Sequence, residues 1–230
     1  MATPAYTGVV HSSTVRSLLT DVLKLDKHGF AISIIDDVSD TMIEDARAII
    51  LAQFLDIKTA TDLIYIDNDV CWQAGGLCRL LSYDVDIVGA SYPRRADPPF
   101  FPIVFPEGSD VLATVNGLLP VERMQGGFLR LTRSAAEKMV DAYKHLEFRT
   151  RPKDDGTERV PGGVAWGVFE PYRLPGTNRK LSEDYAFCQR WRDIGGDIWV
   201  DPFLQMGHGG LATFTGSLGD WLQQKMEFKV

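Results

Sequence analysis

A run of four apolar residues, Leu63-Ile64-Tyr65-Ile66, has no polar alternation and passes directly into Asp67-Asn68-Asp69. Strands that are covered on both faces read as continuous apolar runs, whereas half-exposed strands alternate between apolar and polar residues. Other apolar runs of strand length alternate along the chain with segments of helical spacing, and this order indicates an α/β architecture. We therefore expect a mixed, mostly parallel central sheet flanked by helices.

The same patterning places the individual elements. Helices are expected over residues 15–27, 41–55, 75–81, 134–143, 182–194 and 218–226, and strands over residues 6–10, 30–35, 63–66, 87–90, 128–132 and 198–200. The polar segment 149–163 is expected to be a loop, and residues 207–210 (Gly-His-Gly-Gly) a tight turn. The candidate site residues described next lie at the ends of these elements.

The size and charge of the chain limit what it can do. Its 230 residues suffice for one large domain with a complete hydrophobic core. The formal net charge of −7 argues against nucleic acid as the main partner, because phosphate neutralisation requires a basic surface. No apolar run approaches the roughly 20 residues that span a bilayer, and the first residues lack the pattern of a signal peptide. With three cysteines and no C-x-x-C spacing, we expect a cytoplasmic protein with no transmembrane segment.

The acidic triplet Asp67-Asn68-Asp69 is the first candidate site. Alternate residues of an extended segment point the same way, so Asp67 and Asp69 can approach one object at the ligand-binding edge of the sheet. Two nearby carboxylates repel each other unless a cation or a proton lies between them. Because hard oxygen ligands suit Mg²⁺ or Mn²⁺, the triplet predicts a metal site; the alternative is an ordinary strand-end turn.

Two later features carry further chemistry. Glu183 and Asp184 open the expected helix 182–194, where a carboxylate can act as a general base or can simply offset the helix dipole. His208 lies between Gly207 and Gly209. A neutral imidazole is a common ligand of Mn²⁺-type ions, and a solvent-facing turn histidine is the alternative.

Three more segments contain residues that could bind a ligand. Arg47 lies on the expected helix 41–55, and Arg94 and Arg95 follow the expected strand 87–90. Arginine binds diphosphates through planar bidentate contacts, and the alternative for each is a solvated surface arginine. Gln125-Gly126-Gly127 precedes the strand 128–132 and is typical of a turn with close backbone approach, for example to a ligand.

The order of these features resembles that of nucleotide-sugar-dependent glycosyltransferases with the GT-A fold, similar to family 2 and to small bacterial and phage relatives. The resemblance covers most of the chain, through residues 3–6, 46–48 (where Ala48 replaces the asparagine of a usual Ala-Arg-Asn), 63–70, 86–94, 125–128, 182–192 and 201–209. It implies a single Rossmann-like domain over residues 1–230. The nucleotide-binding half would extend to about residue 115, and the acceptor-side half would begin at about residue 116.

The resemblance also assigns roles to residues. It implies that Mn²⁺ or Mg²⁺ is held by Asp69 and His208, with Asp67 assisting. It implies that Asp184 is the catalytic base, supported by Glu183, and that residues 149–163 form an acceptor-side lid. The residues expected at the nucleotide and the donor sugar are Thr3, Pro4, Tyr6, Asp37, Arg47, Asp67, Asn68, Arg94, Gln125, Gly126 and Gly127.

The implied reaction moves a hexose-type sugar from a nucleotide-sugar, UDP- or GDP-linked, to a hydroxyl of a glycan, lipid-linked or protein acceptor. A lipid-linked acceptor or a partner would bring the protein to the periphery of a membrane. An inverting enzyme would use Asp184, whereas a retaining enzyme would place no base there. Two alternatives stay open: a nucleotidyltransferase, although residues 7–11 hold one glycine and no lysine for a phosphate loop, and a catalytically silent sugar- or nucleotide-binding module.

Overall fold

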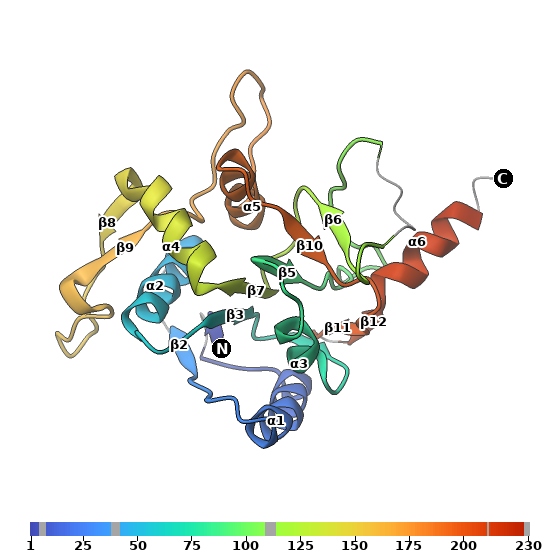
Figure 1. The fold of residues 1–230 in the computed structure, drawn as a ribbon, viewed down its shortest axis with the longest axis horizontal. Helices are drawn as coiled ribbons and strands as arrows, with labels where there is room; N and C mark the ends of the chain where they lie inside the picture. Colours follow the sequence, from blue (N-terminus) through green and yellow to red (C-terminus); the bar gives the residue numbers. More distant parts are fainter. Residues whose placement is uncertain (5–7, 38–41, 109–113, 211, 228–230) are drawn as a thin grey trace.

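A seven-stranded sheet forms the centre of the molecule (Figure 1). The computed structural model describes residues 1–4, 8–37, 42–108, 114–210 and 212–227. The strands are ordered β2 (Ile35–Asp37), β1 (Ala2–Pro4), β3 (Asp62–Ile66), β7 (Phe128–Thr132), β5 (Ile87–Gly89), β10 (Ile198–Val200) and β6 (Leu119–Val121). β7 and β6 run antiparallel to their neighbours, and the other five strands share one direction. The prediction of a mixed, mostly parallel α/β sheet is therefore confirmed.

Helices cover both faces of this sheet. One hydrophobic core includes side chains of α2 (Ile43–Asp56), α4 (Arg133–Ala142), α5 (Glu183–Asp193) and α6 (Leu218–Glu227), and a second includes those of α1 (Ser12–Lys27) and α3 (Gly76–Leu81). In β3, Leu63 and Tyr65 belong to the first core, while Ile64 and Ile66 belong to the second. The apolar run without polar alternation is therefore buried on both faces, as expected.

Two smaller sheets are attached to this body. β12 (Phe214–Gly216), β11 (Met206–His208) and β4 (Val70–Trp72) form one, and β8 (Glu147–Arg149) and β9 (Val164–Trp166) form the other. β4 pairs antiparallel with β11, with His208 opposite Val70. Because Val70 follows Asp69 directly in the chain, this register brings His208 next to the acidic triplet.

Some expected boundaries are wrong. Of residues 30–35, only Ile35 lies in a strand, because the chain turns at Gly29 with a φ of 78° and then runs over the surface before it joins β1. Residues 8–10 form no strand, and residues 5–7 lie outside the described part of the chain. Residues 207–210 are not a simple turn, since His208 ends β11.

The polar segment 149–163 largely behaves as expected. Residues 150–160, which connect β8 to β9, have no helix or strand, and residues 161–163 form a short 3₁₀ turn. The lid role of this connection stays a prediction. None of the helices in the described ranges combines the length and the hydropathy that crossing a bilayer requires.

Candidate functional site

A cleft of about 480 Å³ lies where β1, β3 and β5 end. The residues that were expected in the site and that line this cleft are Pro4, Arg47, Asp67, Asn68, Asp69, Arg94, Gln125, Glu183, Asp184 and His208. The cleft thus brings together segments that are far apart in the sequence. It lies at the edge of the sheet where open α/β folds bind their ligands.

Arg47, supplied by α2, holds three carboxylates together. Its side chain is 2% exposed, and its guanidinium contacts Asp184, Asp67 (Nη2 to Oδ1, 3.0 Å) and Glu183 (Nη1 to Oε1, 3.5 Å). Its carbonyl oxygen accepts a hydrogen bond of 2.8 Å from the Tyr65 hydroxyl, which fixes this turn of the helix to β3. Burial lowers the pKa of Arg47, but the charges of Asp184 and Asp67 outweigh burial and hold the pKa above its usual range. The guanidinium therefore stays charged and neutralises part of the acidic cluster.

The surroundings of Asp184 raise its pKa. Asp184 lies in the first turn of α5 with its side chain 16% exposed. Burial is the largest cause; the charge of Arg47 lowers the pKa, and the charges of Glu183 and Asp67 raise it, so that it is about 6. A carboxylate with this pKa is ionised near pH 7 and is basic enough to take up a proton.

Gly126 and Gly127 allow the backbone to touch the acids. A Cβ atom on Gly126 would lie 2.6 Å from Asp184 Oδ1, and one on Gly127 would overlap the Asp67 carboxylate and the Tyr92 hydroxyl. The Gly127 carbonyl accepts a hydrogen bond of 2.9 Å from the Asp67 N–H. The turn of close approach that the sequence predicts is present, and the groups it approaches are acids of this chain.

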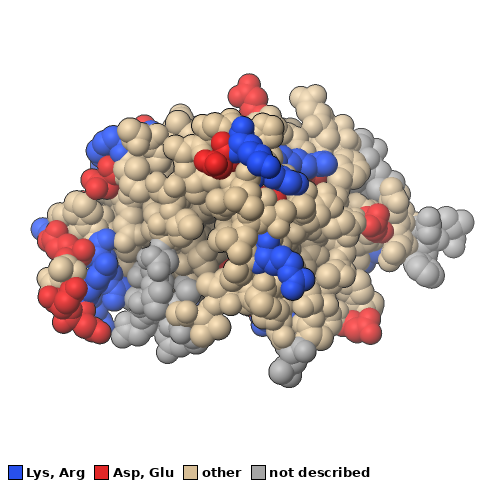
Figure 2. All heavy atoms as spheres, turned by 90° about the horizontal axis from the view of Figure 1, so that it is seen from below, with Lys and Arg blue, Asp and Glu red and all other residues tan. Residues whose placement is uncertain are grey.

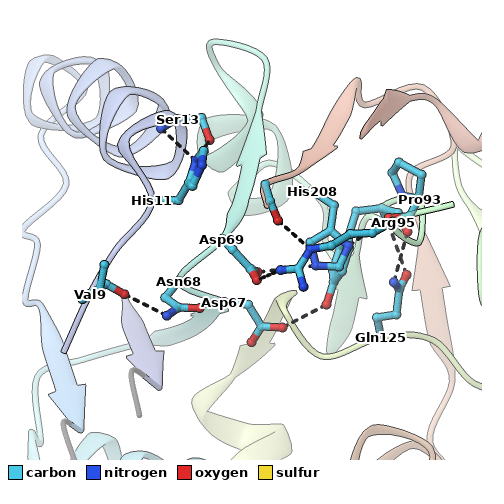
Figure 3. Close-up of polar contacts among 12 residues, drawn as sticks. Val9, His11, Ser13, Asp67, Asn68, Asp69, Pro93, Arg95, Gln125 and His208 are labelled. Carbon is cyan, nitrogen blue, oxygen red and sulfur yellow. Dashed lines mark hydrogen bonds and ion pairs between the residues drawn. The ribbon is translucent and has the colours of Figure 1, made fainter. Parts of the chain in front are cut away.

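Asp67 and Asp69 have different partners. Asp67 Oδ1 pairs with Arg47, and its Oδ2 accepts a hydrogen bond of 2.9 Å from the Tyr92 hydroxyl. Asp69 Oδ1 lies 3.6 Å from His208 Nε2, and its other carboxylate oxygen contacts Arg95 (Figure 3). Both acids line the cleft, but Asp67 faces the arginine of α2 and Asp69 faces the end of β11.

His208 and Asp69 face each other at one end of the cleft. His208 Nδ1 lies 3.0 Å from the Pro93 carbonyl oxygen, which can only accept, so Nδ1 donates and Nε2 faces Asp69. Metal-binding histidines commonly donate their other ring N–H to a carbonyl in this way. Burial raises the pKa of Asp69, but the hydrogen bond and charge of His208 and the charge of Arg95 together lower it below its usual value. Asp69 is therefore an ionised carboxylate that faces Nε2 of His208, and a cation could bind this nitrogen only when it carries no proton.

Whether a divalent cation can be held in the cleft depends on Asp69 and His208. Within the described residues, no three His, Cys, Asp or Glu side chains are grouped closely enough to hold a metal ion. Asp67 is turned to Arg47 and Tyr92 and is not a third ligand in this conformation. A carboxylate suits Mn²⁺ or Mg²⁺, whereas an imidazole suits Mn²⁺-type ions. Arg95 already contacts the Asp69 carboxylate, so cation binding by this pair, like that by the complete three-residue set, stays a prediction.

Asn68 and Gln125 use their amides on the backbone. Asn68 Nδ2 donates a hydrogen bond of 2.8 Å to the Val9 carbonyl (Figure 3). Gln125 Oε1 accepts a hydrogen bond of 2.7 Å from the Ser91 hydroxyl, and its Nε2 donates one of 3.0 Å to the Tyr92 carbonyl. These contacts fix the loops that border the cleft, and the donor-binding roles of both residues stay predictions.

The remaining residues expected at the nucleotide are Thr3, Tyr6, Asp37 and Arg94, and their donor-binding roles stay predictions. Thr3 lies in β1 next to Pro4, opposite β2. Arg94 is exposed, and its side chain makes no hydrogen bond or ion pair with a residue that the structure describes. Tyr6 lies outside the described residues, and Asp37 is described only through its backbone in β2.

Tyr92 is a residue of the site that the sequence did not reveal, and Ile43 and Pro102 also line the cleft without having been predicted. Its ring is buried and lies edge-on to the His208 ring with centroids 5.0 Å apart, while its hydroxyl binds Asp67. It therefore contacts the two parts of the site at once. The only signal for it is an aromatic hydroxyl shortly after the expected strand 87–90, which does not distinguish a site residue from a core residue.

Comparison with known proteins adds information about the fold. No protein-family model matches the chain, and no curated protein matches it. Among solved structures, the chain is similar to A197 from STIV, with a TM-score of 0.52 and 15% sequence identity over 94% of this chain and 88% of that one. At this identity the likeness shows a shared fold over nearly the whole length of the chain.

Proposed function

We propose that this chain is a metal-dependent glycosyltransferase that moves a sugar from a nucleotide-sugar, UDP- or GDP-linked, to an acceptor hydroxyl. One observation carries the proposal. The acidic triplet after β3, the Glu183-Asp184 pair at the start of α5 and His208 at the end of β11 meet in one cleft at the strand ends. Their order in the sequence is the order on which the resemblance to GT-A enzymes rests.

The donor diphosphate would lie between the two ends of the cleft. Arg94 and Arg95 line the cleft and are both exposed, so they offer positive charge to phosphate oxygens. Arg95 contacts Asp69 and also donates a hydrogen bond of 2.6 Å to the Gly209 carbonyl, which keeps it beside the proposed cation ligands. Asp69 and His208 would hold Mn²⁺ or Mg²⁺. When bound there, the cation supplies Lewis-acid stabilisation of the charge on the departing nucleoside diphosphate.

Asp184 is the proposed base of an inverting reaction. The acceptor oxygen attacks the anomeric carbon, the bond from that carbon to the nucleoside diphosphate breaks, and the acceptor proton passes to the Asp184 carboxylate. Arg47 and the nearby Gly126 backbone restrict the orientation of this carboxylate. Glu183, which shares Arg47 with Asp184, adds negative charge that keeps Asp184 basic.

A second candidate is a nucleotide-sugar-binding module that transfers nothing. The internal ion pairs favour it: Asp67, Glu183 and Asp184 are paired with Arg47, and Asp69 is paired with Arg95. In a binding module these pairs would be permanent, and the acids would shape the cleft without taking up a proton.

Donor turnover by wild type and Asp184→Asn separates the two candidates. Release of UDP or GDP from each donor is followed with Mn²⁺ present, and donor affinity is measured in parallel. We expect Asp184→Asn to bind the donor normally and to lose about 10²–10⁴-fold in rate, the usual contribution of a general base. Asp193→Asn, at the exposed far end of the same helix, is the matched control and should be fully active. Binding without any turnover by the wild type would support the module, and a nearly normal rate for Asp184→Asn would remove Asp184 as the base.

A further inference from the structure

Helix α1 buries three polar side chains together with Leu25 and exposes several of its apolar side chains. The buried residues of this helix include Thr14, Ser17 and Asp21. Val15, Leu19 and Leu23 recur every four residues and therefore lie on one side of the helix. Leu19 is 60% exposed and Leu23 is 66% exposed. A helix packed only against its own protein would have the reverse arrangement.

Specific polar contacts hold the helix in this orientation. The Ser17 hydroxyl donates a hydrogen bond of 2.9 Å to the Trp72 carbonyl and accepts one of 3.1 Å from the Trp72 N–H. The Asp21 carboxylate accepts hydrogen bonds from the indole of Trp72, the N–H of Gly75 and the N–H of Leu77. Because these buried groups would lose their partners if α1 rotated, the outward position of the apolar side chains is fixed by the fold.

Further exposed apolar residues lie before and after α1 in the chain. Val9 and Val10 precede α1, and Phe30 and Ile34 follow it; all four are exposed. We call Val15, Leu19 and Leu23 together the α1 apolar face. An exposed set of this kind marks an interaction surface.

The charges near this face indicate what covers it. In α1 and the residues that border it, from 8 to 34, the basic residues are Arg16, Lys24 and Lys27, and the only acids are the buried Asp21 and the exposed Asp26. This local excess of positive charge occurs in a chain whose net charge is −7. Figure 2 views the molecule from the side on which α1 lies and shows blue side chains near the middle of this face, with a red group beside one of them.

We propose that α1 docks the protein on an anionic bilayer surface. Helices that lie in the plane of a membrane interface insert an apolar face between acyl chains and place Lys and Arg at the lipid headgroups. The α1 apolar face, with Arg16 and Lys27 next to it on the helix, has this arrangement. A second copy of the chain is a poorer occupant, because a two-fold contact would bring the same basic side chains of both copies together. The proposal does not depend on the reaction in the cleft.

Co-sedimentation with vesicles tests the docking directly. The probes are vesicles of phosphatidylcholine alone and of phosphatidylcholine with phosphatidylserine in equal parts. We expect the wild-type protein to bind the mixed vesicles, to bind them more weakly at high salt, and to leave the neutral vesicles largely free. Absence of binding to the mixed vesicles, or equal binding to both kinds, would overturn the proposal.

Variants separate the two contributions to binding. The Arg16→Gln/Lys27→Gln pair should weaken the partition onto mixed vesicles about 25-fold, since each basic residue near an anionic surface contributes roughly a factor of five. Leu19→Gln/Leu23→Gln should weaken it by about tenfold or more through loss of acyl-chain contact. Val115→Gln/Phe203→Gln removes two exposed apolar side chains outside α1 and should bind like the wild type.

The thermal stability and the oligomeric state of the variants must also be measured. Because Leu19 and Leu23 are exposed, Leu19→Gln/Leu23→Gln should keep the thermal midpoint of the wild type, so that lost vesicle binding is not lost folding. Sedimentation velocity should find the wild type and this variant in the same oligomeric state. If the wild type were a dimer that this variant dissociates, the face would belong to a second copy and the proposal would be overturned. Loss of vesicle binding by Val115→Gln/Phe203→Gln equal to that of the α1 variants would also overturn it.

Discussion

At the scale of single residues, the candidate site is organised around one buried arginine. Arg47 contacts Asp67, Glu183 and Asp184, which come from the end of β3 and the start of α5. Without a cation these three carboxylates would repel one another in a half-buried cluster. The arginine therefore explains how a chain can keep several acids in one cleft before any ligand arrives.

The raised pKa of Asp184 makes both activity and stability depend on pH. The base must be ionised, so turnover should fall as the pH drops through about 6. The stability effect has the opposite direction. Because the pKa is higher in the folded protein than the ordinary 3.8, the contribution of this group to stability is fully present below pH 3.8 and is lost as the pH rises through about 6.

A difference measurement isolates this group from the other acids. The free energy of unfolding of the wild type minus that of Asp184→Asn, from urea titrations across this pH range, should decrease toward neutral pH. A difference that rises with pH would mean that the Arg47 ion pair dominates and that the pKa of Asp184 is lowered. Asp193→Asn is the control, and its difference should lack this decrease.

Sequence patterns predicted the acidic residues of the site, but not the side chains that contact them in space. Asp67, Asp69 and Asp184 were found because each lies at the end of an element whose apolar pattern is clear. Tyr92 and the contact of Arg95 with Asp69 could not be found in the same way. Both depend on which strand ends are neighbours in space, and spacing along the chain does not encode that.

At the scale of elements, strand pairing and helix orientation complete the site. His208 reaches Asp69 because β11 pairs with β4 in a register that sets His208 against Val70. The sequence indicated the histidine through its flanking glycines, but it predicted a turn where there is a strand. Gly207 has a packing role, since a Cβ there would lie 2.6 Å from the Cys71 sulfur on the paired strand.

The orientation of α1 shows the limit of periodicity. The spacing of Leu19 and Leu23 correctly predicts a helix, yet it does not say which face meets the core. The deciding groups are the buried Ser17 and Asp21, whose partners are supplied by β4 and the start of α3. Polar residues at core positions can be recognised only when their partners are known.

Asp21→Ala tests the link between α1 and α3. It removes the acceptor of three hydrogen bonds, from Trp72, Gly75 and Leu77, and leaves these buried donors unpaired. We expect a loss of about 2–4 kcal/mol in the free energy of unfolding, measured by urea denaturation. Asp26→Ala, an exposed acid in the last turns of the same helix, should change it by less than about 0.5 kcal/mol. Equal effects of the two substitutions would show that the Asp21 contacts do not fix the helix.

At the scale of the whole molecule, the two expected halves share one sheet. β7 pairs with both β3 and β5, and β10 pairs with β5, so strands from after residue 116 alternate with strands from before residue 115. The cleft correspondingly takes Asp69 from the first half and Asp184 and His208 from the second. The layered α/β fold could be predicted from apolar runs, but this alternation of strands could not, because it is set by pairing partners far apart in the chain.

The proposed function requires that the cleft bind a nucleotide-sugar with a divalent cation at Asp69 and His208. A thermal-shift series with UDP, GDP and their sugar conjugates, each with and without Mn²⁺, tests it most directly. A ligand at 100 times its dissociation constant adds roughly 2.7 kcal/mol to the stability of the folded state. We expect such a shift for one nucleotide class, only with Mn²⁺, and its loss in Asp69→Ala. No shift with any nucleotide, or a shift that is the same without Mn²⁺ and in Asp69→Ala, would contradict binding of a nucleotide with a cation at Asp69 and His208.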